Sequence, residues 1–226
     1  YGITTDGTNL YVTEYGNHTV RKVVISTGVV TTLAGTPDNP GSEDGIGMAA
    51  RFYLPSGITT DGINLFVADS GNNTIRKMVI STGEVTTLAG SAGASGFSDG
   101  TGSEAIFYFP RGITTDGTYL FITDYYNDAI RKAVIASGEV TTLARSVRGS
   151  GMTTDGTSLF VPNGNGTICK VIIATGEIST IAGNGDWGST DGAGATASFS
   201  GPSDITTDGT NLFVTDTQNN TIRKIN

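Results

Sequence analysis

The chain has 226 residues, 37% of them hydrophobic and only 15% charged, and its 33 glycines are typical of a globular protein rich in turns. The net charge of −8 disfavours binding to a nucleic-acid backbone, because such binding needs a basic stripe. No apolar run approaches the roughly 18 residues that cross a bilayer, and the single cysteine excludes an internal disulfide.

Composition also suggests a compartment. Lysine is scarce while Thr, Asn, Ser and Gly are abundant, a mixture typical of exported bacterial surfaces, so we expect an extracellular or cell-surface location. The chain begins at Tyr1, and we expect it to be a mature product or an excised piece of a longer protein.

Five units repeat one pattern along the chain. Each opens on a version of Gly-Ile-Thr-Thr-Asp-Gly and continues with versions of Leu-aromatic-Val and Thr-Ile-Arg-Lys, and the first four units then have a version of Val-Thr-Thr-Leu-Ala. The units start near residues 2, 57, 112, 151 and 204 within a single predicted domain, 1–226. A recurring period in this range indicates one supersecondary unit stacked on itself.

Each unit is predicted to contain four strands, which we call a, b, c and d. In the first unit they are Ile3–Thr5, Leu10–Thr13, Thr19–Ile25 and Val29–Ala34. The runs are rich in β-branched and aromatic residues, and turn residues such as Asp-Gly separate them. A meander that is apolar on both faces must be packed between neighbours. The sequence therefore predicts an all-β, five-bladed β-propeller of four-stranded antiparallel blades, with a linear solenoid as the alternative.

Three of the connections between units share an insertion. It reads Asp-Gly-x-Gly from Asp44, Asp99 and Asp191, with Phe eight and Pro eleven residues after the Asp. We expect the phenylalanine to anchor the insertion in the core. Calcium binding is the alternative to a turn-forming role, but one fixed carboxylate per copy is far fewer ligands than calcium takes.

Acidic and basic residues recur at matched places in strands b and c. The acids are Glu14, Asp69, Asp124 and Asp216, and the bases are Arg21, Arg76, Arg131 and Arg223. In the fourth unit, Asn163 and Cys169 replace both together. The joint loss predicts structural ion pairs across the b–c hairpin, with a bidentate Arg–carboxylate geometry. A ligand-binding ring of arginines is the alternative.

Two surfaces are candidates for partner binding. The b–c loops and the insertions lie at the same end of the strands and carry the aromatic residues Tyr15, Tyr125, Tyr126 and Trp187, which we predict to form an interaction face. The last unit has no strand d, so the fifth blade is predicted to lack its outer strand. The open edge consists of Thr221, Ile222, Arg223, Lys224 and Ile225. It could accept a strand from another subunit, or the chain could be a segment of a longer repeat protein.

Residues 2–22, Gly-Ile-Thr-Thr-Asp-Gly-Thr-Asn-Leu-Tyr-Val-Thr-Glu-Tyr-Gly-Asn-His-Thr-Val-Arg-Lys, resemble an NHL repeat, as do residues 57–77, 112–132, 151–170 and 204–224. The resemblance implies a β-propeller, commonly of six blades, that serves as an interaction module, sometimes binds RNA, and in a few families has lyase or hydrolase activity. The Ala-Gly followed by a Ser-Asp-Gly-rich insertion is similar to repeats of large exported bacterial proteins.

The functional prediction is a non-catalytic extracellular scaffold or protein-interaction module, with no cofactor, metal or nucleic acid. The alternative is a self-assembling structural subunit of a surface fibre, joined by strand exchange between copies of the chain at the open last blade. A lyase or hydrolase is the third hypothesis, but catalysis needs convergent acid–base or metal groups. The single histidine, His18, occupies a b–c turn. We therefore predict no catalytic residue.

Overall fold

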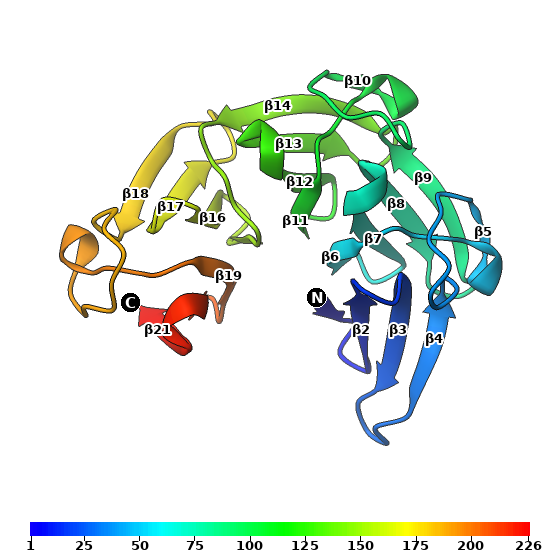
Figure 1. Ribbon diagram of the computed structural model, residues 1–226, viewed down its shortest axis with the longest axis horizontal. Coiled ribbons are helices and arrows are strands. Elements are labelled where there is room, and N and C mark those ends of the chain that lie inside the picture. Colours follow the sequence, from blue (N-terminus) through cyan, green and yellow to red (C-terminus); the bar gives the residue numbers. More distant parts are fainter. The chain divides into compact units, whose positions relative to one another are not determined.

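The computed structural model describes all residues, 1–226, and consists of five antiparallel sheets (Figure 1). We call each sheet a blade and number the blades in chain order. The predicted five-bladed β-propeller of mostly four-stranded antiparallel blades is confirmed, as is a last blade of three strands. No helix of the chain has the length and apolar character that a membrane crossing requires.

The blades have the following strand orders and bounds. Blade one is β1-β2-β3-β4, with β1 Ile3–Thr5, β2 Asn9–Glu14, β3 Thr19–Val24 and β4 Val30–Ala34. Blade two is β5-β9-β8-β7-β6, with β5 Gly45–Ile46, β6 Pro55–Thr60, β7 Asn64–Asp69, β8 Thr74–Val79 and β9 Glu84–Ala89. Blade three is β10-β14-β13-β12-β11, with β10 Gly100–Thr101, β11 Pro110–Thr115, β12 Tyr119–Asp124, β13 Ala129–Val134 and β14 Glu139–Arg145.

The last two blades are simpler. Blade four is β15-β16-β17-β18, with β15 Thr153–Thr154, β16 Ser158–Asn163, β17 Thr167–Ile172 and β18 Ile178–Ala182. Blade five is β19-β20-β21, with β19 Pro202–Thr207, β20 Leu212–Asp216 and β21 Thr221–Ile225. Six 3-10 turns complete the structure: η1 Gly47–Ala49, η2 Ser70–Asn72, η3 Gly102–Glu104, η4 Tyr125–Asn127, η5 Gly194–Thr196 and η6 Thr217–Asn219.

The chain forms two compact units. The first comprises Tyr1–Ile122 and Lys132–Thr141, and the second comprises Thr123–Arg131 and Thr142–Asn226.

An aspartate closes the turn between the first two strands of a blade. In blade one, Asp6 Oδ1 accepts hydrogen bonds from Thr8 N at 2.8 Å and Asn9 N at 2.6 Å, and Gly7 has a φ of 85°. This Asx turn explains why Asp-Gly follows strand a, because Asp satisfies the turn and Gly tolerates the positive φ. The same bonds recur at Asp61, Asp116, Asp155 and Asp208.

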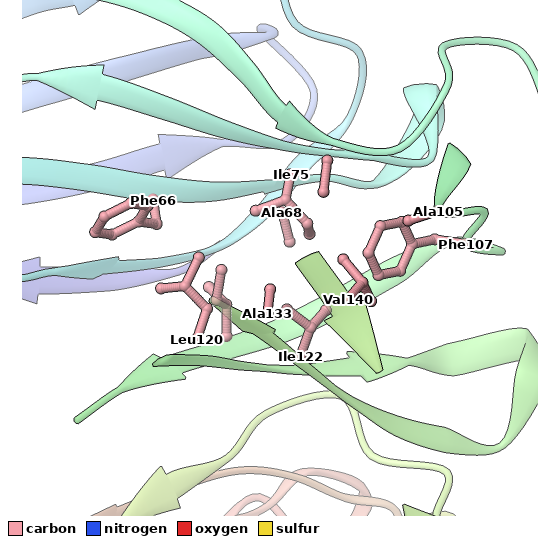
Figure 2. Close-up of a cluster of buried hydrophobic side chains, with 11 residues drawn as sticks. Phe66, Ala68, Ile75, Ala105, Phe107, Leu120, Ile122, Ala133 and Val140 are labelled. Carbon is pink, nitrogen blue, oxygen red and sulfur yellow. The ribbon is translucent and has the colours of Figure 1, made fainter. Parts of the chain in front are cut away.

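The core of the first unit lies between neighbouring blades, as the sequence pattern requires. Figure 2 shows Phe66, Ala68 and Ile75 of blade two facing Leu120 and Ile122, and all five side chains are 0% exposed. A second cluster joins blades one and two. Blades one, two and three thus bury apolar faces against one another, and this burial is the main stabilising term of such a fold.

The core of the second unit repeats this packing between blades four and five. Ile168 of blade four packs in one cluster with Ile205, Leu212 and Val214 of blade five. The phenylalanine of each insertion is buried: Phe52 and Phe107 in the first unit are 0% exposed and Phe199 in the second is 2% exposed. The insertion phenylalanines therefore belong to the core.

Two insertions also extend a blade, which the sequence analysis did not anticipate. β5 pairs antiparallel with β9, so blade two has five strands, and β10 pairs with β14 in blade three (Figure 1). A short connection, Ser146–Met152, precedes blade four, and its outermost strand, β18, pairs only with β17. The insertions therefore cover the outer edges of blades two and three but leave that of blade four bare.

Candidate functional site

A buried arginine links three segments of blade two. Arg76 of β8 is 1% exposed at its side chain. Its Nη1 lies 2.9 Å from Asp69 Oδ2 at the end of β7, and its Nη2 lies 2.7 Å from Asp44 Oδ1 in the insertion. The guanidinium also donates to the carbonyl oxygens of Arg51 at 2.8 Å and Glu43 at 3.0 Å. Every terminal nitrogen thus has charged and main-chain acceptors, which makes the buried charge tolerable.

Blade five repeats this arrangement with Arg223. Its Nη1 lies 3.0 Å from Asp216 Oδ2 and its Nη2 lies 2.6 Å from Asp191 Oδ1. The ring of Phe199 lies 5.0 Å from the guanidinium, as the ring of Phe52 lies 5.2 Å from that of Arg76. We call these groups the arginine clamps, defined by Arg76 with Asp69 and Asp44, and by Arg223 with Asp216 and Asp191.

The other two predicted pairs are also in contact. Arg131 lies 2.9 Å from Asp124, and both side chains are 0% exposed. Arg21 lies 3.2 Å from Glu14, with their side chains 28% and 29% exposed. We predicted that each arginine would bind both oxygens of one carboxylate. In the clamps, the two terminal nitrogens of the guanidinium instead bind two different carboxylates. The reason is that the insertion supplies a second acid.

The insertion aspartates were predicted to form turns, with calcium binding as the alternative, but Asp44 and Asp191 pair with the clamp arginines. Asp44 Oδ1 also accepts from Thr87 Oγ1 at 3.0 Å, and Asp44 Oδ2 accepts from Thr87 N at 3.2 Å. This carboxylate therefore ties the insertion to Arg76 and to strand β9. No group of three or more His, Cys, Asp and Glu side chains is arranged to hold a metal ion. A signal was present in the sequence, because the connection between the third and fourth units lacks the Asp-Gly-x-Gly insertion and the fourth unit also lacks the arginine.

Asp69 illustrates the electrostatics of a clamp. The buried carboxylate accepts hydrogen bonds from Arg76 Nη1, from Asn72 Nδ2 at 2.8 Å and from Tyr53 N at 2.7 Å. Burial raises the pKa of Asp69 to about 6, and these donors oppose that rise by favouring the charged form. The clamp is thus a structural group in which both terminal nitrogens of Arg76 are paired, while its Nε is buried without a hydrogen-bond partner.

Blade four replaces the ion pair with neutral groups. Asn163 Nδ2 lies 3.7 Å from Cys169 Sγ, which is 3% exposed. Asn163 Oδ1 accepts from Arg148 N at 3.0 Å, as Asp69 Oδ1 accepts from Tyr53 N. Asparagine therefore retains the main-chain contact of the aspartate without its charge. Cys169 is a packed thiol among buried strands.

Two of the predicted interaction residues form a cluster in the second unit. Tyr125 and Tyr126 of η4 have ring centroids 5.2 Å apart with an edge-to-face angle of 73°. The Arg148 guanidinium lies 4.8 Å from the ring of Tyr125 and 5.8 Å from that of Tyr126, and its Nε lies 3.5 Å from Asp128 Oδ1. Tyr126 is 46% exposed. We call Tyr125, Tyr126, Asp128 and Arg148 the Tyr–Arg cluster.

The remaining predicted interaction residues are Tyr15 and Trp187. Tyr15 belongs to the first unit, where its ring lies 5.2 Å from that of Tyr1. Trp187 lies in the insertion before blade five and is 59% exposed. His18 takes a left-handed φ of 61° at its b–c turn, and its Nδ1 accepts from Leu54 N at 3.1 Å. Its counterpart Asn73 accepts from Phe109 N in the same way, so the histidine serves the turn.

The predicted open edge is β21, the last strand in the order of its sheet. Ile222 on this strand is 67% exposed. A cavity of about 520 Å³ lies beside the strand, lined among others by Asp191, Phe199, Arg223 and Ile225. This cavity occupies the place between β21 and the insertion where blade two holds β9 between β8 and β5. Strand d is thus the part of blade five that is absent.

The fold and the repeated sequence units are similar to those of NHL-repeat β-propellers. No family model matches this chain. NHL repeat-containing protein 2 of Bos taurus is 34% identical to it over 132 residues, which cover 54% of this chain and 18% of that protein. The chain thus spans about a fifth of the length of this curated relative. The predicted resemblance to NHL repeats is confirmed at the level of the repeat.

Solved structures are similar in fold. A chain of the nidogen/laminin complex aligns with a TM-score of 0.74 and 20% identity, covering 100% of this chain and 74% of that chain. Streptogramin B lyase aligns with a TM-score of 0.65 and 15% identity, covering 100% of this chain and 68% of that one. At these identities the likeness shows the fold alone. One neighbour is a lyase and another is part of a protein complex, so the fold does not decide between catalysis and binding.

Proposed function

We propose that this chain is a non-catalytic protein-interaction module, located outside the cell or at its surface, that binds a protein partner through its b–c loops. The observation that carries the proposal is the Tyr–Arg cluster. Tyrosine and arginine are the residue types that dominate binding energy at protein interfaces, and here they are already stacked on one another. Stacking reduces the side-chain entropy that a partner must remove on binding.

The charges of the cluster indicate what it would recognise. Asp128 contacts only Nε of Arg148, so the two terminal nitrogens of the guanidinium remain for a carboxylate or a main-chain carbonyl of the partner. The side chain of Arg148 is 46% exposed, which keeps that end accessible. The fold likeness to a chain of the nidogen/laminin complex is consistent with a binding role. The exported location is supported by composition.

The test compares the intact chain with a Tyr126→Ala, Arg148→Ala double variant. Extracellular proteins of the host are captured on each, and the protein enriched on the intact chain is purified and titrated by calorimetry. We expect the double variant to bind it about 30-fold more weakly, the effect of losing one interface hot spot. Ile3→Ala, an exposed position in the first unit, serves as the control. Equal affinity of the double variant would refute the proposal, and an antibody that reaches the chain only after cell lysis would refute the location.

An enzymatic role has the weaker support. Streptogramin B lyase shares the fold, but the single histidine of this chain accepts a hydrogen bond from the main chain of Leu54, and no group of side chains is arranged to hold a metal ion. We therefore infer no turnover of a streptogramin B by the purified chain. Conversion of that compound, measured by mass spectrometry and abolished by His18→Ala, would overturn this inference.

The cavity beside β21 favours a second candidate function, a structural subunit that assembles by strand exchange. Its walls match those that hold β9 in blade two, so a strand with the pattern Val-Thr-Thr-Leu-Ala-Gly would fit it. If another copy supplies that strand, sedimentation velocity will show concentration-dependent polymers, and a peptide copy of residues 84–90 will dissociate them. A chain that stays monomeric at all concentrations would exclude this role.

A further inference from the structure

The chain itself shows what covers the outer edge of a strand d. In blade two, Gly45 pairs with Val85 and Ile46 pairs with Glu84. Gly47 N then donates to Gly83 O in the turn between β8 and β9, at 2.9 Å. The edge of β9 is therefore satisfied by one extended Gly-Ile-Gly segment.

Blade three repeats this cover with another sequence. Gly100 pairs with Val140 and Thr101 pairs with Glu139, and Gly102 N donates to Gly138 O at 3.1 Å. The two covering segments share the form Gly-x-Gly with a β-branched residue in the middle. Their common register shows that main-chain pairing, rather than one particular side chain, holds the cover in place.

Blade four has the same strand d without a cover. β18 has no partner on its outer side in the sheet order. Ile178 is 38% exposed, whereas its counterparts Val85 and Val140 are 0% and 1% exposed. The difference is the effect of the missing segment, because the strands are otherwise alike in sequence. An apolar side chain and an unpaired strand edge are thus exposed together.

The main-chain groups of this edge are directed outward. Ile172 N donates to Glu177 O at 2.9 Å, which makes that a hydrogen-bonded pair of the β17–β18 ladder. Antiparallel ladders alternate, so the N–H and C=O of Ile178 and of Thr180 point away from β17. Residues 178–182 contain no proline and no charge. This edge therefore lacks the proline and charged residues that usually prevent strand addition.

We propose that the outer edge of β18 binds an extended segment of a protein partner by strand addition. The segment has the form Gly-Ile-Gly or Gly-Thr-Gly, runs antiparallel to β18, and places its first glycine opposite Ile178 and its middle residue opposite Glu177. An aspartate before the first glycine meets no arginine here, because Cys169 stands where Arg76 receives Asp44 in blade two, but it would accept from Thr180 as Asp44 accepts from Thr87. This inference rests on the proposed protein-binding function and adds a second contact site to it.

The probe is a synthetic peptide, acetyl-Ser-Glu-Asp-Gly-Ile-Gly-Met-Ala-amide, which copies residues 42–49, the cover of blade two. It is titrated into the nitrogen-15-labelled intact chain. We expect saturable shifts of the Ile178 and Thr180 amides, while Val85 and Val140, already covered, do not move. Absence of saturable shifts at β18 would overturn the proposal.

Two variants test the mode of binding. Ile178→Pro removes an outward N–H and leaves the β17 ladder intact, so we expect about tenfold weaker binding, the effect of one lost hydrogen bond. Ile178→Lys places a charge on the exposed edge and should weaken binding similarly, which keeps the test valid if the proline variant unfolds. Unchanged affinity in both variants would overturn the proposal.

The Tyr126→Ala, Arg148→Ala variant separates this inference from the proposed function. We expect it to bind the peptide as the intact chain does. A chain that binds its protein partner through the Tyr–Arg cluster but not the peptide would overturn the edge site alone. A chain that binds the peptide while the double variant keeps full affinity for its partner would overturn the cluster alone.

Discussion

Blades two and four have the same strand pattern but are stabilised differently. In blade two, Arg76 is buried between Asp69 and Asp44, and β5 covers the outer strand. In blade four, Asn163 and Cys169 occupy the places of the ion pair, and β18 is uncovered. The two blades therefore show that the insertion, the arginine and the acid form one structural unit.

The physical reason lies in the acceptors of the guanidinium. Arg76 donates to Asp69, Asp44, Glu43 O and Arg51 O, and the last three of these four acceptors belong to the insertion. An arginine at position 169 of blade four, which lacks the insertion, would be buried with a single acceptor. Removing a charge from water without full pairing costs several kcal/mol, so blade four is more stable with a neutral residue there.

The largest expected effect comes from placing the arginine of blade two into blade four. Cys169→Arg inserts a guanidinium at a position that is 3% exposed and has Asn163 rather than a carboxylate beside it. We expect the free energy of unfolding to fall by about 5 kcal/mol, because the charge is buried without a partner. Urea unfolding followed by circular dichroism measures this.

Adding a carboxylate beside the new arginine tests whether the acid alone can replace the insertion. The double variant Asn163→Asp, Cys169→Arg should recover part of the loss, but not all of it, because the acceptors of the insertion are still missing. Full recovery would show that one carboxylate is enough, and the three-part unit would then be the wrong description.

The second prediction breaks the clamp of blade two. Arg76→Met leaves the buried Asp69 without its cation, and we expect a loss of about 3–5 kcal/mol in the free energy of unfolding. The matched control is Arg21→Met in blade one, where both partners are more than a quarter exposed and the loss should stay below about 1 kcal/mol. Similar losses at both positions would mean that burial does not decide the strength of these pairs.

The sequence predicts most of the fold and part of the site. Internal repetition predicts the strands, because Asp-Gly turns and β-branched runs recur in every unit. The joint loss at Asn163 and Cys169 marks the contact between Arg76 and Asp69. The second carboxylate of the clamp was assigned to a turn or a calcium site instead. Its contact depends on how a long insertion folds back onto the outer strand.

The covering strands and the Tyr–Arg cluster could not be predicted for a similar reason. β5 and β10 have only two residues each, too few for any periodic pattern to identify them. Arg148 meets Tyr125 across two separate loops, and no spacing in the chain links them. Local pattern predicts strands and turns, whereas these contacts arise from packing between loops.

A third and smaller effect is expected from the insertion aspartate. Asp44→Ala removes the bonds to Arg76 Nη2, Thr87 N and Thr87 Oγ1, and we expect a loss of about 1–2 kcal/mol. Hydrogen exchange of the Thr87 amide should accelerate as β5 detaches. The control is Asp191→Ala, whose carboxylate is 94% exposed, and a loss there equal to that of Asp44→Ala would contradict a role for β9 in holding the insertion.

The smallest expected effect is on the pH dependence of stability. Blades two and four share the Asx-turn aspartate, but only blade two has the buried aspartate of a clamp. Burial acts to raise the pKa of Asp61 in blade two and of Asp155 in blade four, but hydrogen bonds in the Asx turns outweigh it and lower both below 3.8. A lowered pKa stabilises the fold at higher pH, so both turns should lose stability as the pH falls below about 4.

The contribution of Asp69 to stability depends on pH in the opposite direction. Its pKa is raised to about 6, so its protonation between pH 6 and 3.8 favours the folded state. Carbon-13 NMR of the carboxyl groups should show Asp69 titrating near pH 6 and the two turn aspartates below pH 4. Titration of Asp69 below pH 4 would show that the clamp donors outweigh burial, and blade two would then differ from blade four in pairing but not in its response to acid.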